Sequence, residues 1–147
     1  MVDEKVWLWE GKPFNTSDIN TFFGFVYIIT NTLTGKKYIG RKYFYSTNRV
    51  KQKHKKVRKI IRKESDWYKY YGSSKTLLAD IKEFGKENFK REILSLHEGR
   101  GDVNYYELRE QILRSVLEHD DYYNDNIMTR FYRKKNKTMS VFSRVAP

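Results

Sequence analysis

Two tyrosines, Tyr27 and Tyr38, lie eleven residues apart in the stretch GFVYIITNTLTGKKYIG at residues 24–40. A phenol with its ordinary pKa of about 10 is a poor base at neutral pH unless positive charge or a metal ion assists it. The most basic stretch of the chain follows directly, with eleven Lys or Arg and no acid over residues 41–63. The pair can be two ordinary sheet residues, since tyrosine is favoured in strands, and a chemical role for it has to come from further motifs.

The same stretch predicts the element that positions the tyrosines. Residues 25–30 are β-branched and aromatic, residues 31–35 are a polar turn, and residues 36–40 return the chain. In such a hairpin we expect Tyr27 opposite Tyr38 or its immediate neighbour, where opposite residues share a face at roughly 5 Å between Cβ atoms. Two phenols would then project side by side.

Two helices and one more strand are expected downstream. Ser73 or Ser74 can cap a helix that ends at Gly85, and residues 88–96 read as a strand. A second helix is expected from about Val103 to Glu118. Its predicted buried side is Leu108, Ile112, Leu113, Val116 and Leu117, and the opposite, mostly polar line is Val103, Glu107, Gln111 and Arg114.

This order of elements indicates an α/β (α+β) domain with a small, mainly antiparallel three-stranded sheet flanked by helices. The 147 residues suit a single domain. We divide the chain into an N-terminal extension at 1–22, a core at 23–126 with a basic arm at 41–63, and a basic tail at 127–147. The extension is expected to pack its tryptophans on the body as an irregular or short-strand segment. The arm is expected to be extended or an irregular strand pair.

The net charge of +12 is unevenly distributed. Residues 41–63 and 130–147 hold 17 of the 30 basic residues and none of the acids, which leaves the remainder at −5. Clustered positive charge of this kind is typical of proteins that bind nucleic acid. A solvated loop or a membrane-surface patch is the alternative, but neither run has an amphipathic helical stripe.

Several other classes are excluded or disfavoured. The absence of cysteine excludes disulfides, zinc–thiolate sites and a cysteine nucleophile. No apolar run is long enough for a membrane span, and the charged start predicts no signal peptide.

The ordered motifs of the chain resemble the GIY-YIG nucleases. Those motifs are Gly24 to Tyr27, the turn with Thr34-Gly35-Lys36, Tyr38-Ile39-Gly40, the Ser73-Ser74 helix, Asn88-Phe89, a helix bearing a glutamate, and Tyr123-Asn124. The resemblance covers roughly residues 24–126 and is closest to small phage-type and homing-endonuclease-like members.

This resemblance implies a DNA endonuclease that hydrolyses phosphodiester bonds in the cytoplasm of a bacterial or phage-infected cell. Tyr27 and Tyr38 would take the places of the two family tyrosines, one of which acts as, or relays to, the general base. Glu107 would bind one Mg²⁺ (or Mn²⁺), with Glu110 as the alternative, because a single carboxylate suffices for an ion that keeps most of its waters. Asn124 corresponds to the late asparagine that helps to organise the site.

The catalytic arginine is where the sequence departs from the family pattern. The family often has it about ten residues after the second tyrosine, but position 48 is Asn. We favour Arg49 over Arg62, which, like Arg58, is an option if the longer stretch between Gly40 and Ser73 shifts the alignment. The other nearby cations are expected to contact DNA phosphates: Lys42, Lys51, Lys53, Lys55, Lys56, Arg58 and Lys59.

The expected partner is double-stranded DNA and not a membrane. Cutting both strands would require a homodimer on DNA or sequential nicking, and the sequence does not choose between them. The alternative function is a non-catalytic nucleic-acid-binding module on the same fold.

Overall fold

The predicted hairpin is formed by β3 (Gly24–Asn31) and β4 (Lys37–Tyr43) in a computed structural model that describes residues 6–135 and 139–145. At the turn, the Asn31 backbone N–H donates to the Lys36 carbonyl, and the Asn31 side chain accepts from the Leu33 N–H at 3.0 Å. Gly35 has a φ of 79°, which side-chain-bearing residues rarely adopt. Local chemistry therefore accounts for this hairpin.

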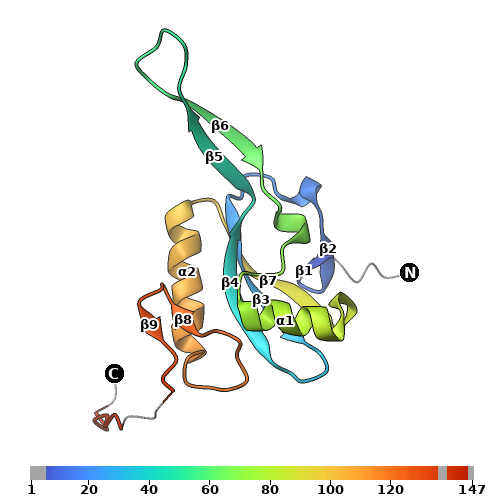
Figure 1. Cartoon of the computed structure of the whole chain (residues 1–147), viewed down its shortest axis with the longest axis vertical. Helices are drawn as coiled ribbons and strands as arrows, with labels where there is room; N and C mark the ends of the chain where they lie inside the picture. Colours follow the sequence, from blue (N-terminus) through green and yellow to red (C-terminus); the bar gives the residue numbers. More distant parts are fainter. Residues whose placement is uncertain (1–5, 136–138, 146–147) are drawn as a thin grey trace.

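The main sheet is larger than the three strands predicted. Its order is β2-β1-β7-β3-β4, where β1 (Trp7–Trp9), β2 (Lys12–Phe14) and β7 (Phe89–His97) join the hairpin (Figure 1). Because β1 runs parallel to β7, the sheet is mixed. The N-terminal segment adds two strands that are too short to show a period of two in the sequence.

The predicted packing of that segment's tryptophans on the body is confirmed. Trp7 is fully buried, and its indole N–H donates to the Trp67 carbonyl at 2.8 Å. The boundaries drawn at residues 22 and 126 stay a prediction, and residues 1–5, 136–138 and 146–147 of the extension and tail lie outside the described residues.

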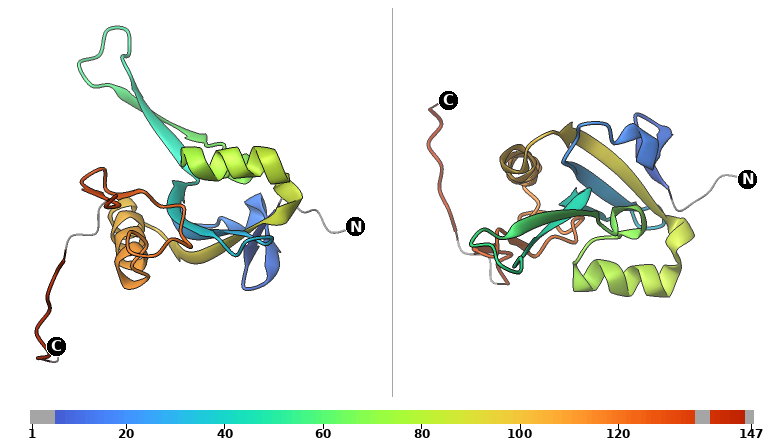
Figure 2. Two further views of the ribbon diagram at one scale, coloured as in Figure 1. Left: turned by 60° about the horizontal axis from the view of Figure 1, so that its bottom comes forward. Right: turned by 90° about the horizontal axis from the view of Figure 1, so that it is seen from above.

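Two helices pack against opposite faces of the sheet, α1 (Lys75–Phe84) and α2 (Arg100–Leu113) (Figure 2). Phe25 and Tyr27 of β3 belong to the same core cluster as Leu77 of α1, whereas Val26 and Ile28 belong to a cluster beside α2. The alternation of a strand thus divides the core into two layers. As predicted, Ser74 caps α1 by accepting from the Leu77 N–H at 3.3 Å, and Gly85 ends it.

The orientation predicted for the second helix is confirmed in part, because Leu108, Val116 and Leu117 pack in a core cluster as expected. Val103 and Gln111, from the predicted polar line, are buried, whereas Ile112 and Leu113 are 58% and 66% exposed. The helix also begins earlier and ends earlier than expected, at Leu113. The predicted polar side of the helix faces the sheet because Gln111 and Glu107 form polar contacts with β4. A hydrophobicity pattern does not contain information about such contacts.

The smaller elements connect these layers. They are η1 (Thr16–Asp18), η2 (Trp67–Lys69), η3 (Lys86–Asn88), β8 (Asn126–Ile127) and β9 (Phe131–Tyr132). No helix in the described part of the chain is long and apolar enough to cross a membrane.

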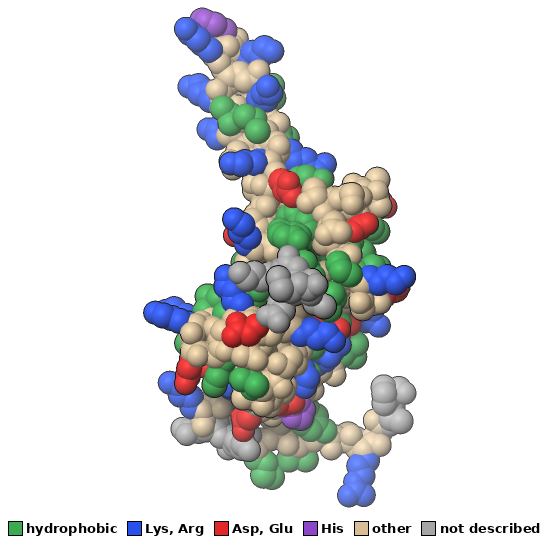
Figure 3. Space-filling view, turned by 90° about the vertical axis from the view of Figure 1, so that its right-hand side faces the viewer, with side chains coloured by type: hydrophobic (Ala, Val, Ile, Leu, Met, Phe, Trp, Pro, Cys, Tyr) green, Lys and Arg blue, Asp and Glu red, His purple; other side chains and the backbone are tan. Residues whose placement is uncertain are grey.

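The basic arm is confirmed as a strand pair. β5 (Tyr45–Val50) and β6 (Lys59–Glu64) form an antiparallel ribbon that extends away from the body (Figure 1). Lys and Arg side chains line the visible side of this ribbon along its length (Figure 3).

Candidate active site

Tyr27 and Tyr38 share a face of the β3–β4 hairpin, but they are not opposite each other. Tyr27 pairs with Gly40, and Tyr38 pairs with Ile29. The tyrosines are therefore diagonal neighbours, with ring centroids 6.2 Å apart. The prediction that the two phenols share one face is confirmed. The predicted pairing is wrong by one position, because Tyr27 lies opposite Gly40 and not opposite Tyr38 or a residue next to it.

Gly40 leaves the space that the Tyr27 ring occupies. A Cβ at position 40 would lie 2.6 Å from the Tyr27 Cζ atom and closer still to its hydroxyl oxygen. Gly72 covers the pair from the other side, since a Cβ there would lie 3.3 Å from Tyr38 Cε1 and 3.4 Å from the Tyr27 hydroxyl. The β3–β7 register also shifts between Val26 and Tyr27, and such bulges commonly re-aim a side chain beside an active site.

A third phenol, Tyr70, joins the pair. Its ring lies edge-on to Tyr27 at 6.2 Å between centroids, and its proximity raises the pKa of Tyr27. The backbone of Tyr70 is held by the buried Arg91, which donates to the Tyr70 carbonyl at 2.8 Å. Sequence reasoning missed Tyr70 because it was one of several aromatic residues expected to pack against the sheet.

Lys42 is fixed beside this third phenol. Its ammonium lies 4.0 Å from the Tyr70 ring centroid and 2.6 Å from an Asp66 carboxylate oxygen. The hydrogen bond from Lys42 lowers the pKa of Asp66. Lys42 was predicted to contact DNA phosphate, and it is the one predicted DNA-binding cation that lies at the tyrosine cluster.

The environment raises the pKa of both hairpin tyrosines. Burial raises the pKa of Tyr27 well above its usual 10.0, and Tyr38, Tyr70 and Glu107 raise it further. Burial raises the pKa of Tyr38 to about 12, opposed by a hydrogen bond from Ser73. The expected lowering of a phenol pKa by the basic stretch is wrong for this state, because nine of its eleven cations lie on the ribbon of β5 and β6 and only Arg41 and Lys42 lie in β4.

Glu107 and Arg41 form an ion pair next to the tyrosines. Arg41 Nε lies 3.3 Å from Glu107 Oε1, and the Glu107 side chain is only 22% exposed. Burial raises the pKa of Glu107, and the positive charge of Arg41 partly offsets this effect. The charge of Glu107 also raises the pKa of Tyr27 and of Tyr38, so the carboxylate lies within electrostatic reach of both phenols.

The site wraps around the outer edge of β4. Tyr38 and Gly40 face the α1 side, whereas the alternating position of Arg41 turns its side chain to the α2 side, where Glu107 lies. Because β4 is the last strand of the sheet, groups from both faces meet at its edge.

The structure distinguishes the two candidate glutamates. Glu110 forms an ion pair with Arg114 on its own helix at 2.9 Å, and Glu107 contacts the residue directly after Gly40. In the described residues no group of three or more His, Cys, Asp or Glu could hold a metal. A carboxylate such as Glu107 nevertheless fits a Mg²⁺ ion that keeps most of its waters.

Asn124 holds the centre of β4 in place. Its side-chain oxygen accepts from the Ile39 N–H at 3.0 Å, and its amide donates to the Ile39 carbonyl at 2.9 Å. Gln111 donates to the same carbonyl at 3.3 Å. Both amides are buried, so they fix the backbone between Tyr38 and Gly40 and position the tyrosine pair.

Arg133 of the basic tail belongs to this support and not to a free cationic surface. Its guanidinium donates to the carbonyls of Asn124 at 2.8 Å, His119 at 2.9 Å and Tyr122 at 3.1 Å. The sequence showed only a charge at this position, because the carbonyls that it contacts are arranged by the turn after α2.

The two arginines favoured from the sequence lie on the arm. Arg49 is exposed on β5, and Arg62 on β6 stacks its guanidinium on the Tyr45 ring at 3.7 Å. Neither forms an ion pair in the described ranges, whereas Arg41 pairs with Glu107. Sequence reasoning did not select Arg41, although its place directly after Tyr38-Ile39-Gly40 was a usable signal. The remaining predicted DNA contacts lie on the same arm: Lys51, Lys53, Lys55, Lys56, Arg58 and Lys59.

Comparison with known proteins decides the family. A family model described as "Putative endonuclease segE, GIY-YIG domain" matches residues 7–127. The chain belongs to the GIY-YIG endonuclease family. The GIY-YIG match begins at β1 and ends in β8, so it includes the N-terminal strands as well as the tyrosine hairpin.

A curated relative agrees with this GIY-YIG assignment. The "Putative endonuclease segE" of Enterobacteria phage T4 is 31% identical over 102 residues, which are 69% of this chain and 40% of the T4 protein. The aligned part thus spans about two-fifths of that relative's length. No solved structure matches the chain.

Proposed function

We propose that this chain is a divalent-metal-dependent DNA endonuclease that hydrolyses phosphodiester bonds. The observation that carries the proposal is the meeting of Tyr27, Tyr38, Arg41 and Glu107 at the edge of β4 in a member of the GIY-YIG family. Hydrolysis of a phosphodiester needs an activated water, positive charge for the phosphate oxygens and protonation of the leaving oxygen. This set supplies phenols, a guanidinium and a carboxylate for those tasks.

In this proposal Tyr27 relays a proton instead of meeting the water itself. Its side chain is 1% exposed, and its ring lies edge-on to that of the less buried Tyr70 at 6.2 Å between centroids. One phenol of the cluster would first lose its proton to solvent, and this phenolate would accept a proton from a neighbouring phenol as that neighbour takes one from the attacking water. The phenols then end neutral and the water becomes hydroxide. The raised pKa of Tyr27 and of Tyr38 keeps both phenols neutral until substrate and metal bring positive charge to the site.

Glu107 is proposed to hold one Mg²⁺ (or Mn²⁺). The carboxylate is an oxygen donor of the type these ions prefer, and its only ion-pair partner in the described residues is Arg41. A bound divalent ion would lower the pKa of a coordinated water and stabilise charge on the phosphate. Arg41, released from Glu107, would then be free to contact the phosphate directly.

The remaining roles concern the catalytic arginine, Asn124 and the cations of the arm. Arg41 is our first choice for the arginine that stabilises the transition state, and Arg49 and Arg62 stay as the predictions made from the sequence. Asn124 is proposed as a positioning residue, because its side-chain amide bonds both backbone groups of Ile39 and the substrate would lie beyond that strand. The arm cations are proposed to bind the phosphates of double-stranded DNA.

A nicking assay tests the proposal. Supercoiled plasmid incubated with the full chain should be cut with Mg²⁺ or Mn²⁺ and not with EDTA, and Tyr27→Phe or Glu107→Ala should abolish cutting while DNA binding persists. Open circles followed by linear DNA would indicate sequential nicking, and direct linearisation would indicate a homodimer on DNA. Salt-sensitive binding without cutting in either ion would instead indicate the non-catalytic binding module.

A further inference from the structure

The β5–β6 arm exposes side chains that the body of the protein does not use. Within the arm, whose residues are all described, no cation forms an ion pair, and Val50, Val57, Ile60 and Ile61 are between 43% and 75% exposed. An isolated two-stranded hairpin is marginally stable in water, so exposed β-branched residues on such a ribbon need a partner surface.

The register divides the ribbon into two different faces. On one face Tyr45 pairs with Glu64, Thr47 with Arg62, and Arg49 with Ile60. Tyr45 packs against the core and Arg62 stacks on Tyr45, so the base of this face is occupied by the body of the protein.

The residues of the other face are all exposed. It pairs Ser46 with Lys63, Asn48 with Ile61, and Val50 with Lys59. Asn48 and Ile61 therefore form the middle pair, and each end pair contains one lysine. This face thus combines polar side chains that can form hydrogen bonds, apolar side chains and cations.

We propose that the arm is a DNA-reading ribbon, which lies in the major groove of double-stranded DNA with Asn48, Val50 and Ile61 against the base edges. The inference rests on DNA being the partner, as proposed above, but assigns base recognition to residues that have no part in cleavage. An amide can bond an adenine bidentately in that groove, and an apolar side chain can contact the methyl group of thymine.

The dimensions of the ribbon favour this groove. The major groove, about 12 Å wide, admits a two-stranded β-ribbon, whereas the minor groove is only about 6 Å wide. Six residues per strand extend roughly 20 Å, or about six base pairs.

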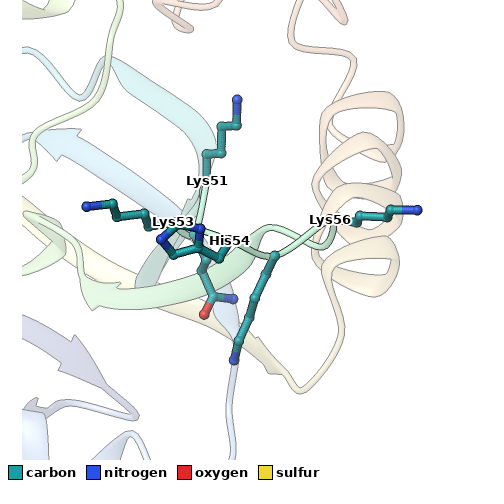
Figure 4. A pocket seen from close by; sticks show the side chains of 6 residues that line it. Lys51, Lys53, His54 and Lys56 are labelled. Atoms are coloured by element: carbon teal, nitrogen blue, oxygen red, sulfur yellow. The ribbon is translucent and has the colours of Figure 1, made fainter.

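The tip of the arm supplies the phosphate contacts that this position requires. The side chains of Lys51, Lys53 and Lys56 point in different directions from the loop that joins the strands (Figure 4). Cations that spread outward from the end of a ribbon can meet the backbones on both sides of a groove. Such contacts orient the ribbon but carry no sequence information.

Selection of binding sites from random duplexes tests the proposal without depending on cleavage. The full chain is incubated with a pool of random 30-base-pair duplexes in EDTA, and the bound fraction is amplified and sequenced. We expect the wild type to enrich a short motif and the Asn48→Ala/Ile61→Ala variant to lose preference at two or three adjacent positions. Each lost base contact should reduce discrimination about tenfold to hundredfold.

Two controls make the outcome specific. Thr47→Ala/Ile60→Ala on the opposite face should enrich the wild-type motif, and Lys53→Ala/Lys56→Ala should weaken binding to all duplexes and reduce its salt dependence. Thermal unfolding checks that each variant keeps its fold. Absence of any enriched motif, or the same motif from the wild type and Asn48→Ala/Ile61→Ala, would overturn the proposal. Failure of the endonuclease proposal would appear separately, as an uncut plasmid in the nicking assay.

Discussion

Asn124 and Ile39 are joined by two hydrogen bonds although they lie 85 residues apart in the sequence. The amide of one residue satisfies both backbone groups of the other, at 3.0 and 2.9 Å, on the open side of an edge strand. The late segment of the chain thereby completes the strand that carries Tyr38 and Gly40.

Asn124→Ala should destabilise the protein. The buried N–H of Ile39 would lose its partner, and the carbonyl would keep only Gln111, so we expect a loss of about 2–3 kcal/mol in the free energy of unfolding. Urea denaturation measures this quantity. Asn104→Ala, on an exposed part of α2, should change it by less than about 1 kcal/mol. Equal midpoints for the two variants would contradict a structural role for Asn124.

Gly40→Ala should displace Tyr27. The added methyl group would overlap the Tyr27 ring, and a misplaced catalytic group commonly costs about 100-fold in rate. Plasmid nicking under single-turnover conditions gives the rate. Gly101→Ala is the matched control, because a Cβ there meets nothing within 4 Å and alanine favours the helix. Full activity of Gly40→Ala would show that Tyr27 need not lie over Gly40.

Arg41→Ala should affect the chemical step more than binding. Removing a group that stabilises transition-state charge typically costs about 10²–10³-fold in rate. Comparison of single-turnover rates with DNA affinities for Arg41→Ala, Arg49→Ala and Arg62→Ala separates the candidates. We expect the arm variants to weaken DNA binding and reduce its salt dependence. The largest loss of rate in Arg49→Ala or Arg62→Ala would return the catalytic role to the arm.

Glu107→Gln should stabilise the metal-free protein at neutral pH. Burial raises the pKa of Glu107, so the folded protein holds this proton more tightly than the unfolded chain, and stability falls as pH rises through the raised pKa. Gln carries no charge and removes this cost, so its melting temperature should be higher at pH 7 and its advantage should disappear in acid. A lower melting temperature at pH 7 would show that the Arg41 pair outweighs burial.

Magnesium should stabilise the wild type and Glu110→Gln but not Glu107→Gln. A ligand present at 100 times its Kd adds about 2.7 kcal/mol to the stability of the state that binds it. Melting temperatures recorded over a Mg²⁺ titration detect this binding without any cleavage. If Mg²⁺ raised the melting temperature of Glu107→Gln but not that of Glu110→Gln, Glu110 and not Glu107 would be the metal ligand.

The phenols should make the fold sensitive to alkali. Tyr38, with a pKa of about 12, and Tyr27 stay protonated in the folded protein at pH values where phenols of the unfolded chain ionise. Stability should therefore decline as pH rises from about 10 towards 12, and Tyr38→Phe should reduce that decline. Ultraviolet titration of tyrosine ionisation and melting curves measure both effects. The same decline in Tyr38→Phe and wild type would contradict the burial argument.

Local signals predicted the elements that depend on neighbouring residues. The hairpin, the Ser74 cap, the Gly85 stop and the extended arm all follow from turn, capping and strand chemistry within a few positions. The strand order did not, since β1 and β2 show no periodicity and join the sheet only by pairing with β7.

The second helix shows why a hydrophobicity pattern was insufficient. Its polar line faces the sheet because Gln111 and Glu107 find partners on β4, and its exposed Ile112 and Leu113 look like core residues in sequence. Polar groups are buried only where they find hydrogen-bond or ion-pair partners, and here those partners are distant in the sequence.

The sequence by itself determined the family, the tyrosine pair, the glutamate and asparagine candidates, and the cationic arm, because residue types and their order carry those signals. The tertiary structure decided which groups meet. Arg41 faces Glu107, Tyr70 contacts Tyr27, and Arg49 and Arg62 extend away on the ribbon. The physical reason is that successive side chains of β4 lie on opposite faces of the sheet, and groups from both faces meet because β4 is an edge strand. Neither the register nor the edge position is known until the strands are paired.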